Sequence, residues 1–75
     1  MLLVTGGAGF IASNFLHYLL TVTDEEIVVL DSFTYAANKE YVPSQVTLIE
    51  CDIADKDHVD EVFAKYKPRK VFNFA

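Results

Sequence analysis

The apolar residues of this chain follow two spacings, one typical of strands and one typical of helices. Short, largely apolar runs at residues 1–5, 27–30, 46–50 and 70–74 predict strands, and their near-continuous hydrophobicity favours a sheet covered on both faces. Between the first two runs the period changes. Residues 9–20 repeat apolar side chains at every fourth position in two adjacent rows, which indicates a helix with a broad apolar stripe.

A second helix is expected between the third and fourth strands. Its apolar side chains recur at helical spacing at Val59, Val62, Phe63 and Tyr66. Asp55 is a suitable N-cap, acidic residues precede lysines as the helix dipole favours, and Pro68 ends the helix. Residues 32–44 show no clear period, so we expect a loop with at most one helical turn.

The predicted order is strand, helix, strand, loop, strand, helix, strand. This alternation predicts an α/β fold with a parallel sheet and right-handed crossovers. If the first strand is central, the strand order is 3-2-1-4, which is the first half of a doubly wound parallel sheet. No linker composition divides residues 1–75, so we expect them to form part of one domain.

The most informative segment is the glycine-rich turn between the first strand and the first helix. Gly6, Gly9 and Ala12 fit the G-x-x-G-x-x-G/A spacing of a dinucleotide-binding turn. Gly6 is expected to take unusual backbone angles, and Gly9 to let a pyrophosphate approach the backbone without a Cβ in the way. Ala12 stands where a third glycine would bring helix and strand close together. The flanking strand and helix favour this interpretation over a simple glycine-rich turn.

An acidic residue follows the second strand at the expected distance from the glycines. The carboxylate of Asp31 can accept hydrogen bonds from the adenosine ribose hydroxyls, and its charge would repel a 2′-phosphate. No arginine lies in residues 31–45, so the sequence favours NAD over NADP. After the third strand, Asp52 and Ile53 are candidates for an adenine contact, with Ile53 as an apolar wall. A turn-forming role alone is an equally good interpretation of Asp52.

Composition and charge argue against several other kinds of function. The net charge is −5, which disfavours nucleic acid and anionic membranes as partners. The basic cluster is interpreted as a solvated helix end and consists of Lys65, Lys67, Arg69 and Lys70. The single cysteine, Cys51, is expected to be a small buried or strand-end residue. No signal-peptide pattern and no apolar stretch of the ~20 residues that span a bilayer is present, so a cytoplasmic location is expected.

Four segments together resemble the extended short-chain dehydrogenase/reductase family, whose cofactor domain has the Rossmann fold. They are residues 5–14, 29–38, 51–53 and 71–75. The Leu-Asp-x-x-Thr-Tyr-Ala stretch is most similar to the nucleotide-sugar 4,6-dehydratases, those acting on dTDP-glucose in particular. The resemblance covers all 75 residues, which would be about the first quarter of such an enzyme.

The resemblance implies NAD-binding roles for particular positions. Those implied to line the pyrophosphate are Gly6, Gly9, Phe10 and Ile11. Those implied to hold the adenosine ribose and phosphate region are Asp31, Ser32 and Thr34, with Asp52 and Ile53 at the adenine. Those implied to approach the ribose near the nicotinamide are Phe74 and Ala75. No metal ligand is assigned.

Three positions depart from the dehydratase pattern. Ser32 stands where lysine is common, Ala37 replaces a frequent glycine, and Cys51 replaces the glycine of a Gly-Asp-Ile triplet. Tyr35 and Lys39 have the Y-x-x-x-K spacing of the family's catalytic pair. We interpret that match as coincidence, because the pair needs a helix and these residues fall in the expected loop.

The resemblance implies a parent enzyme that is an NAD-dependent lyase acting on a nucleotide sugar, and a homodimer. In such dehydratases, hydride leaves sugar C4, water is eliminated across C5–C6, and hydride returns to C6. Their catalytic Tyr/Lys pair and substrate domain follow the region that these 75 residues match, so no catalytic residue is assigned here. The alternatives are a nucleotide-sugar epimerase or decarboxylase, and a noncatalytic dinucleotide-binding protein.

The isolated 75-residue chain is expected to be inactive and marginally stable. Its fourth strand should be an exposed edge, and helices that would complete both faces of the sheet should be missing. We therefore expect the isolated polypeptide to expose apolar surface and to self-associate.

Overall fold

The computed structural model describes residues 1–6, 8–32 and 42–74. Their helices and strands follow the predicted order. The elements are β1 (Leu2–Thr5), α1 (Phe10–Val22), β2 (Ile27–Asp31), β3 (Thr47–Glu50), α2 (Lys56–Tyr66) and β4 (Lys70–Asn73). The sequence motif formed by Tyr35 and Lys39 lies outside the described residues, as do Thr34, Ala37 and Ala75.

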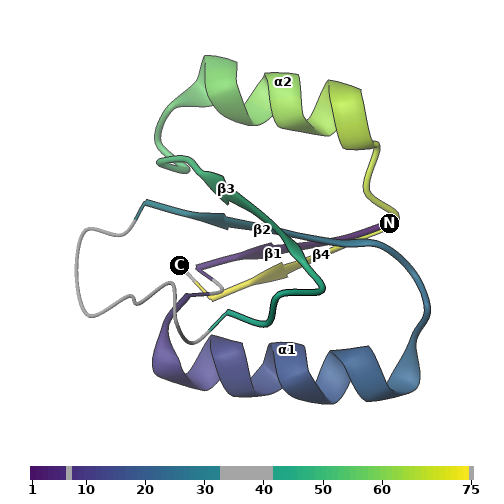
Figure 1. The fold of residues 1–75 in the computed structure, drawn as a ribbon. Coiled ribbons are helices and arrows are strands. Elements are labelled where there is room, and N and C mark those ends of the chain that lie inside the picture. The colour runs from purple at the N-terminus through teal and green to yellow at the C-terminus, as the bar shows by residue number, and fades with distance from the viewer. Residues whose placement is uncertain (7, 33–41, 75) are drawn as a thin grey trace.

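The four strands form one parallel sheet in the order β3-β2-β1-β4, which confirms the predicted topology (Figure 1). β1 pairs with both neighbours, so that Leu2 lies opposite Ile27 on β2 and opposite Lys70 on β4. β2 pairs with β3 from Val28 and Thr47 onward. Because all the strands run in the same direction, their carboxyl ends lie at one edge of the sheet.

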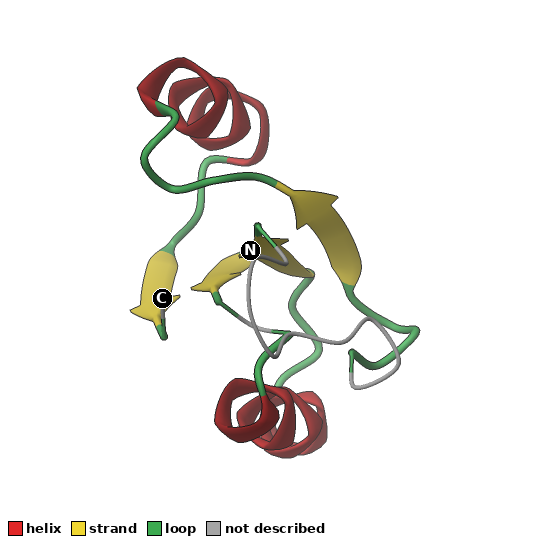
Figure 2. Cartoon of the chain, turned by 90° about the vertical axis from the view of Figure 1, so that its left-hand side faces the viewer, coloured by secondary structure: helices red, strands yellow, loops and turns green. Residues whose placement is uncertain are grey.

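The two helices cover opposite faces of the sheet (Figure 2). Successive strand side chains point to opposite faces, so each central strand contributes to two cores. The buried core on the α1 side consists of Leu2, Val4, Leu16, Leu19, Ile27 and Val29. The buried core on the α2 side consists of Leu3, Val28, Leu30, Cys51 and Val62. Every residue of β1 and β2 is buried, which explains their continuous apolar runs and confirms the expected burial of Cys51.

The boundaries of α1 differ slightly from the predicted range of residues 9–20. Gly9 has φ −72° and ψ 163°, so it is the N-cap and belongs to the turn. At the other end, the Thr23 N–H donates to the Leu19 carbonyl at 3.2 Å, and backbone hydrogen bonding extends the helix beyond its apolar stripe. Neither α1 nor α2, the helices of the described ranges, is long and apolar enough to cross a membrane.

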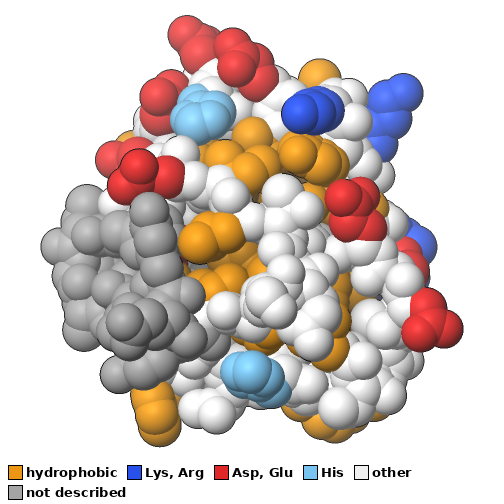
Figure 3. Space-filling view, viewed as in Figure 1, with side chains coloured by type: hydrophobic (Ala, Val, Ile, Leu, Met, Phe, Trp, Pro, Cys, Tyr) orange, Lys and Arg blue, Asp and Glu red, His pale blue; other side chains and the backbone are white. Residues whose placement is uncertain are grey.

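The outer strands β3 and β4 are less buried than the central pair. Val71 on β4 is 47% exposed, and Phe63 on α2 is also exposed. On the α1 side, Phe15 packs against Phe72 with the ring centroids 5.1 Å apart, which covers part of β4. Figure 3 shows apolar surface between α2 and the strands as well. The expected exposed edge is therefore present in the described part of the chain, and self-association stays a prediction.

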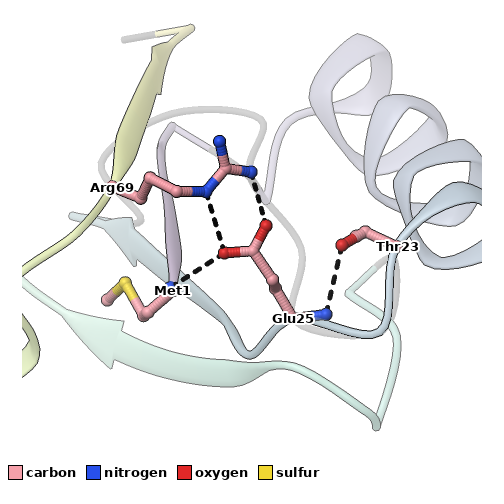
Figure 4. Close-up of polar contacts among 4 residues, drawn as sticks. All are labelled: Met1, Thr23, Glu25 and Arg69. Atoms are coloured by element: carbon pink, nitrogen blue, oxygen red, sulfur yellow. Dashed lines mark hydrogen bonds and ion pairs between the residues drawn. The ribbon is translucent and has the colours of Figure 1, made fainter.

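At the opposite, amino-terminal edge of the sheet, one carboxylate links three segments (Figure 4). Glu25, in the turn before β2, accepts from the Met1 amino group at 3.1 Å and from Nε of Arg69 at 3.1 Å. Its other carboxylate oxygen accepts a second bond from the Arg69 guanidinium. Hydrogen bonds from Arg69 and then from the Met1 amino group lower the pKa of Glu25 from 4.5 to about 2.

This contact corrects the interpretation of Arg69 as part of a solvated helix end. Arg69 lies in the short connection between α2 and β4, and its partner is 44 residues away in the sequence. No local pattern indicates a pair at that separation. The contact ties the starts of β1, β2 and β4 together.

The Glu25 contact predicts a specific acid sensitivity. Because folding lowers the pKa of this carboxyl group, the ionised form stabilises the folded state above pH 4.5, and that contribution is lost as the pH falls toward about 2. Urea midpoints measured between pH 5 and pH 2.5 should therefore fall more steeply for the unmodified chain than for Glu25→Gln. The neighbouring substitution Glu26→Gln is the matched control and should keep the steep dependence. Equal slopes for all three chains would contradict the prediction.

Candidate functional site

The candidate site lies at the edge of the sheet where the carboxyl ends of the strands meet. In open parallel sheets, a ligand site forms at this edge where successive crossovers diverge. Here the chain proceeds from β1 to β2 and β3 on one side and returns to β4 on the other, so the divergence lies beside β1. Gly6 lines two of the hollows that open at this edge among the described residues.

Gly6 turns the chain out of β1 in a conformation that favours glycine. Its φ is +72°, a value at which a side chain would be strained. The Gly6 N–H donates to the Leu30 carbonyl of β2 at 2.7 Å, and the Gly6 carbonyl accepts from the Gly9 N–H at 3.4 Å. The unusual backbone angles expected of Gly6 are therefore present.

Gly9 is a glycine for a different reason. Its φ of −72° is open to any residue, and the nearest atom to a Cβ built there is the Gly6 carbonyl oxygen at 3.6 Å, an ordinary contact. The fold of the described residues thus leaves room for a side chain at this position. Gly9 lines the second hollow, so the absent side chain keeps the backbone there accessible to a ligand.

The start of α1 is unlike the start of α2. Asp55 caps α2 by accepting from the His58 N–H at 3.2 Å, and Asp57 adds an acid in the first turn. Among the described residues, no side chain caps α1 and no acid lies in its first turn. The positive end of the α1 dipole therefore faces the second hollow without a nearby carboxylate in that turn, an arrangement that favours an anion.

Asp31 ends β2 and is 3% exposed. Its Oδ2 atom accepts a hydrogen bond from the Ala8 N–H at 2.9 Å, so the carboxylate holds the glycine-rich turn. Its main-chain carbonyl accepts from the Cys51 N–H at 3.0 Å. The sequence pattern predicted Asp31 as a ligand-binding residue but did not indicate its bond to Ala8, because that bond depends on how the turn folds back over β2.

The first hollow brings together the residues predicted for the adenosine half of a dinucleotide. Its lining consists of Gly6, Leu30, Asp31, Ser32, Cys51, Asp52 and Ile53. Asp52 also holds its own turn, since its Oδ1 atom accepts from the Ala54 N–H at 2.9 Å. Both interpretations of Asp52 therefore fit its position.

The second hollow brings together the residues predicted for the pyrophosphate and the far ribose. Its lining consists of Gly6, Gly9, Phe10, Ile11, Ala12 and Phe74. Phe10 is 70% exposed and Ile11 is 75% exposed, which is unusual for large apolar side chains. Phe74 is held against Phe15 with the ring centroids 5.3 Å apart. The predicted residues Thr34 and Ala75 lie outside the described residues.

The sequence interpretation missed three residues at this edge, namely Ala8, Leu30 and Cys51. Leu30 and Cys51 line the first hollow, and they directly precede the predicted residues Asp31 and Asp52. Burial raises the pKa of the Cys51 thiol, and the charges of Asp55 and Asp52 raise it further, so the thiol is protonated and a poor nucleophile. Within residues 1–6, 8–32 and 42–74, no group of three or more His, Cys, Asp or Glu side chains could hold a metal ion.

Comparison with known proteins identifies the family to which this chain belongs. The model of the NAD dependent epimerase/dehydratase family matches residues 2–75. The low-salt glycan biosynthesis protein Agl12 of Haloferax volcanii is 43% identical over 67 residues, which cover 83% of this chain and 22% of that protein. The dTDP-glucose 4,6-dehydratase of Neisseria gonorrhoeae is 38% identical over 79 aligned positions, which cover 99% of this chain and 23% of the enzyme.

A solved structure shares the fold. The UDP-glucose 4-epimerase of Thermus thermophilus, in complex with NAD, matches with a TM-score of 0.89 and 38% identity, over 99% of this chain and 23% of the epimerase. The chain therefore spans less than a quarter of the length of each of these three proteins.

The two glycines predict different responses to the same substitution. Gly6→Ala should lower the free energy of unfolding by about 1–2 kcal/mol, because alanine is strained at a φ of +72°. Gly9→Ala should change it by less than about 1 kcal/mol and can raise it, because φ and space both suit alanine there. Urea unfolding of the two variants beside the unmodified chain measures this difference. Equal destabilisation by both substitutions would contradict the assignment of separate roles.

Proposed function

Because this chain belongs to the NAD dependent epimerase/dehydratase family, we propose that it is the first part of the NAD-binding domain of an enzyme that modifies a nucleotide sugar. The observation that carries the proposal is the pair of hollows joined at Gly6. A dinucleotide has two nucleoside halves joined by a pyrophosphate. The two hollows and the turn between them offer a place for each part at one edge of the sheet.

Different residues of the chain would bind different parts of NAD, according to their chemistry. The N-terminus of α1 and the backbone near Gly9 would hold the pyrophosphate, since both favour an anion. Asp31 would accept hydrogen bonds from the adenosine ribose, and Ile53 would provide an apolar wall for adenine. Phe74 would lie beside the ribose of the nicotinamide half. When bound, NAD supplies a centre that accepts and returns hydride.

NAD is favoured over NADP by charge. Asp31 would repel a 2′-phosphate, and no arginine or lysine lies in residues 31–38 to attract one. Ser32, which stands where related dehydratases commonly have lysine, adds no positive charge. The epimerase/dehydratase family to which the chain belongs is also NAD dependent.

We propose a 4,6-dehydratase of the dTDP-glucose type as the parent activity. The similarity to the Neisseria dehydratase and the Leu-Asp-x-x-Thr-Tyr-Ala stretch support this choice. A nucleotide-sugar 4-epimerase is the second candidate, because the Thermus epimerase is equally identical to this chain at 38%. The reaction depends on residues outside the part of such enzymes that this chain matches.

Cofactor binding can be tested with the full chain and isothermal titration calorimetry. The unmodified chain should bind NAD and bind NADP more weakly. Gly9→Val should weaken NAD binding by about tenfold or more, because its side chain enters the second hollow and removes a contact to the pyrophosphate. Val22→Ala, an exposed substitution at the far end of α1, is the control and should bind as the unmodified chain does. Equal NAD affinity of the Gly9→Val and unmodified chains would reject the assigned pyrophosphate site.

The choice between the two reactions is tested with the full-length enzyme that we propose contains this chain. Incubation with dTDP-glucose should give a 4-keto-6-deoxy sugar, detected by the loss of the C6 hydroxymethyl signal in NMR spectra. UDP-glucose incubated in parallel should remain unchanged. Formation of UDP-galactose with no 4-keto product would support the epimerase instead.

A further inference from the structure

We propose that Asp31 is a positioning residue for the glycine-rich turn, so that the shape of the cofactor site and the choice between NAD and NADP depend on the same carboxylate. The part of this inference that concerns cofactors rests on the proposed function. The part that concerns the turn rests on the hydrogen bond between Asp31 Oδ2 and the Ala8 N–H, which is 2.9 Å long.

Asp31 is itself held rigidly. It belongs to β2, and its main-chain carbonyl accepts from Cys51 at the end of β3. The adjacent Leu30 carbonyl accepts from Gly6 at the first position of the turn. Within the described residues, the end of β2 therefore holds the turn by main chain at Gly6 and by side chain at Ala8.

The side-chain bond is buried at both ends. Asp31 is 3% exposed and Ala8 is fully buried. A buried backbone N–H that loses its acceptor is left unsatisfied until water enters from the adjoining first hollow or the turn opens or shifts to meet another acceptor. Another contact across the described part of the turn, from the Gly9 N–H to the Gly6 carbonyl, is long at 3.4 Å. We infer that the bond to Asp31 fixes the middle of the turn.

Because Asp31 both holds the turn and would repel a 2′-phosphate, substituting it should affect cofactor binding in two ways. A smaller neutral residue at position 31 removes the charge that repels a 2′-phosphate, which by itself should favour NADP. The same change releases Ala8 and disturbs the turn that both cofactors need. Asp31→Ala should therefore weaken both NAD and NADP. Asp31→Asn removes the charge but keeps an oxygen that can accept from Ala8, so it should weaken NAD and spare NADP.

The turn is tested without cofactor by amide hydrogen exchange and NMR on the full chain. The readout is the exchange rate of the Ala8 amide relative to that of Val29, a buried residue in the middle of β2. Asp31→Ala should raise this ratio by about tenfold or more, and Asp31→Asn should raise it much less. Glu50→Ala is the matched control, because Glu50 is paired in register with Asp31 and its removal changes the local charge without touching the turn. It should leave the ratio unchanged.

Each outcome of the hydrogen-exchange measurement either supports or overturns the positioning role of Asp31. An unchanged Ala8 ratio in Asp31→Ala, or equal ratios in the Ala and Asn variants, would overturn the positioning role. If Asp31→Ala does not fold, the proposal is tested with the Asp31→Asn variant by itself. Its Ala8 amide proton should shift upfield, because a neutral amide is a weaker acceptor than a carboxylate. No shift beyond that seen with Glu50→Ala would reject the proposal.

Cofactor titrations of the same variants complete the test. Weaker binding of both NAD and NADP by Asp31→Ala, with NADP binding retained in Asp31→Asn, supports the proposal. Tighter NADP binding by Asp31→Ala than by the unmodified chain overturns the link to cofactor choice. If the unmodified chain binds neither cofactor, the proposed function fails, whereas the Ala8 exchange still decides the positioning role.

Discussion

Burial of β1 and β2 on both faces is the constraint on which the rest of this structure depends. Two buried strands side by side require a helix on each face, and parallel pairing brings all the carboxyl ends to one edge. The chain meets this requirement by placing α1 and α2 on opposite sides of the sheet. The glycine-rich turn, Asp31, Asp52 and Phe74 lie together because each follows or ends a strand at that edge.

The end of β2 connects this architecture to the candidate site. The Leu30 carbonyl and the Asp31 carboxylate both accept from the turn, so the conformation of the turn depends on the position of β2 in the sheet. The opposite edge is held by Glu25 and Arg69. The two edges thus differ, since an ion pair joins the segments at one edge and hollows open beside the start of α1 at the other.

The placement of strands and helices could be predicted from the sequence because it follows from local periodicity. The strand order was predicted from their alternation together with a central first strand. Continuous apolar runs mark buried strands, and the change of period marks α1 and α2. The position of Gly6 was also predictable, since a turn that requires positive φ favours glycine. The bond from Ala8 to Asp31 and the pairing of Arg69 with Glu25 were not, because they join residues that are 23 and 44 positions apart.

The sequence by itself determined the α/β class, the parallel sheet and the residue types at the candidate site, because hydrophobic period and glycine spacing are local properties. Only the tertiary structure decided which of these residues share a hollow, that Gly9 is free of packing constraints from the described residues, and that Asp31 holds the turn. The physical reason is that hydrogen bonds and hollows between distant segments depend on how the strands are registered, and no local pattern records that register.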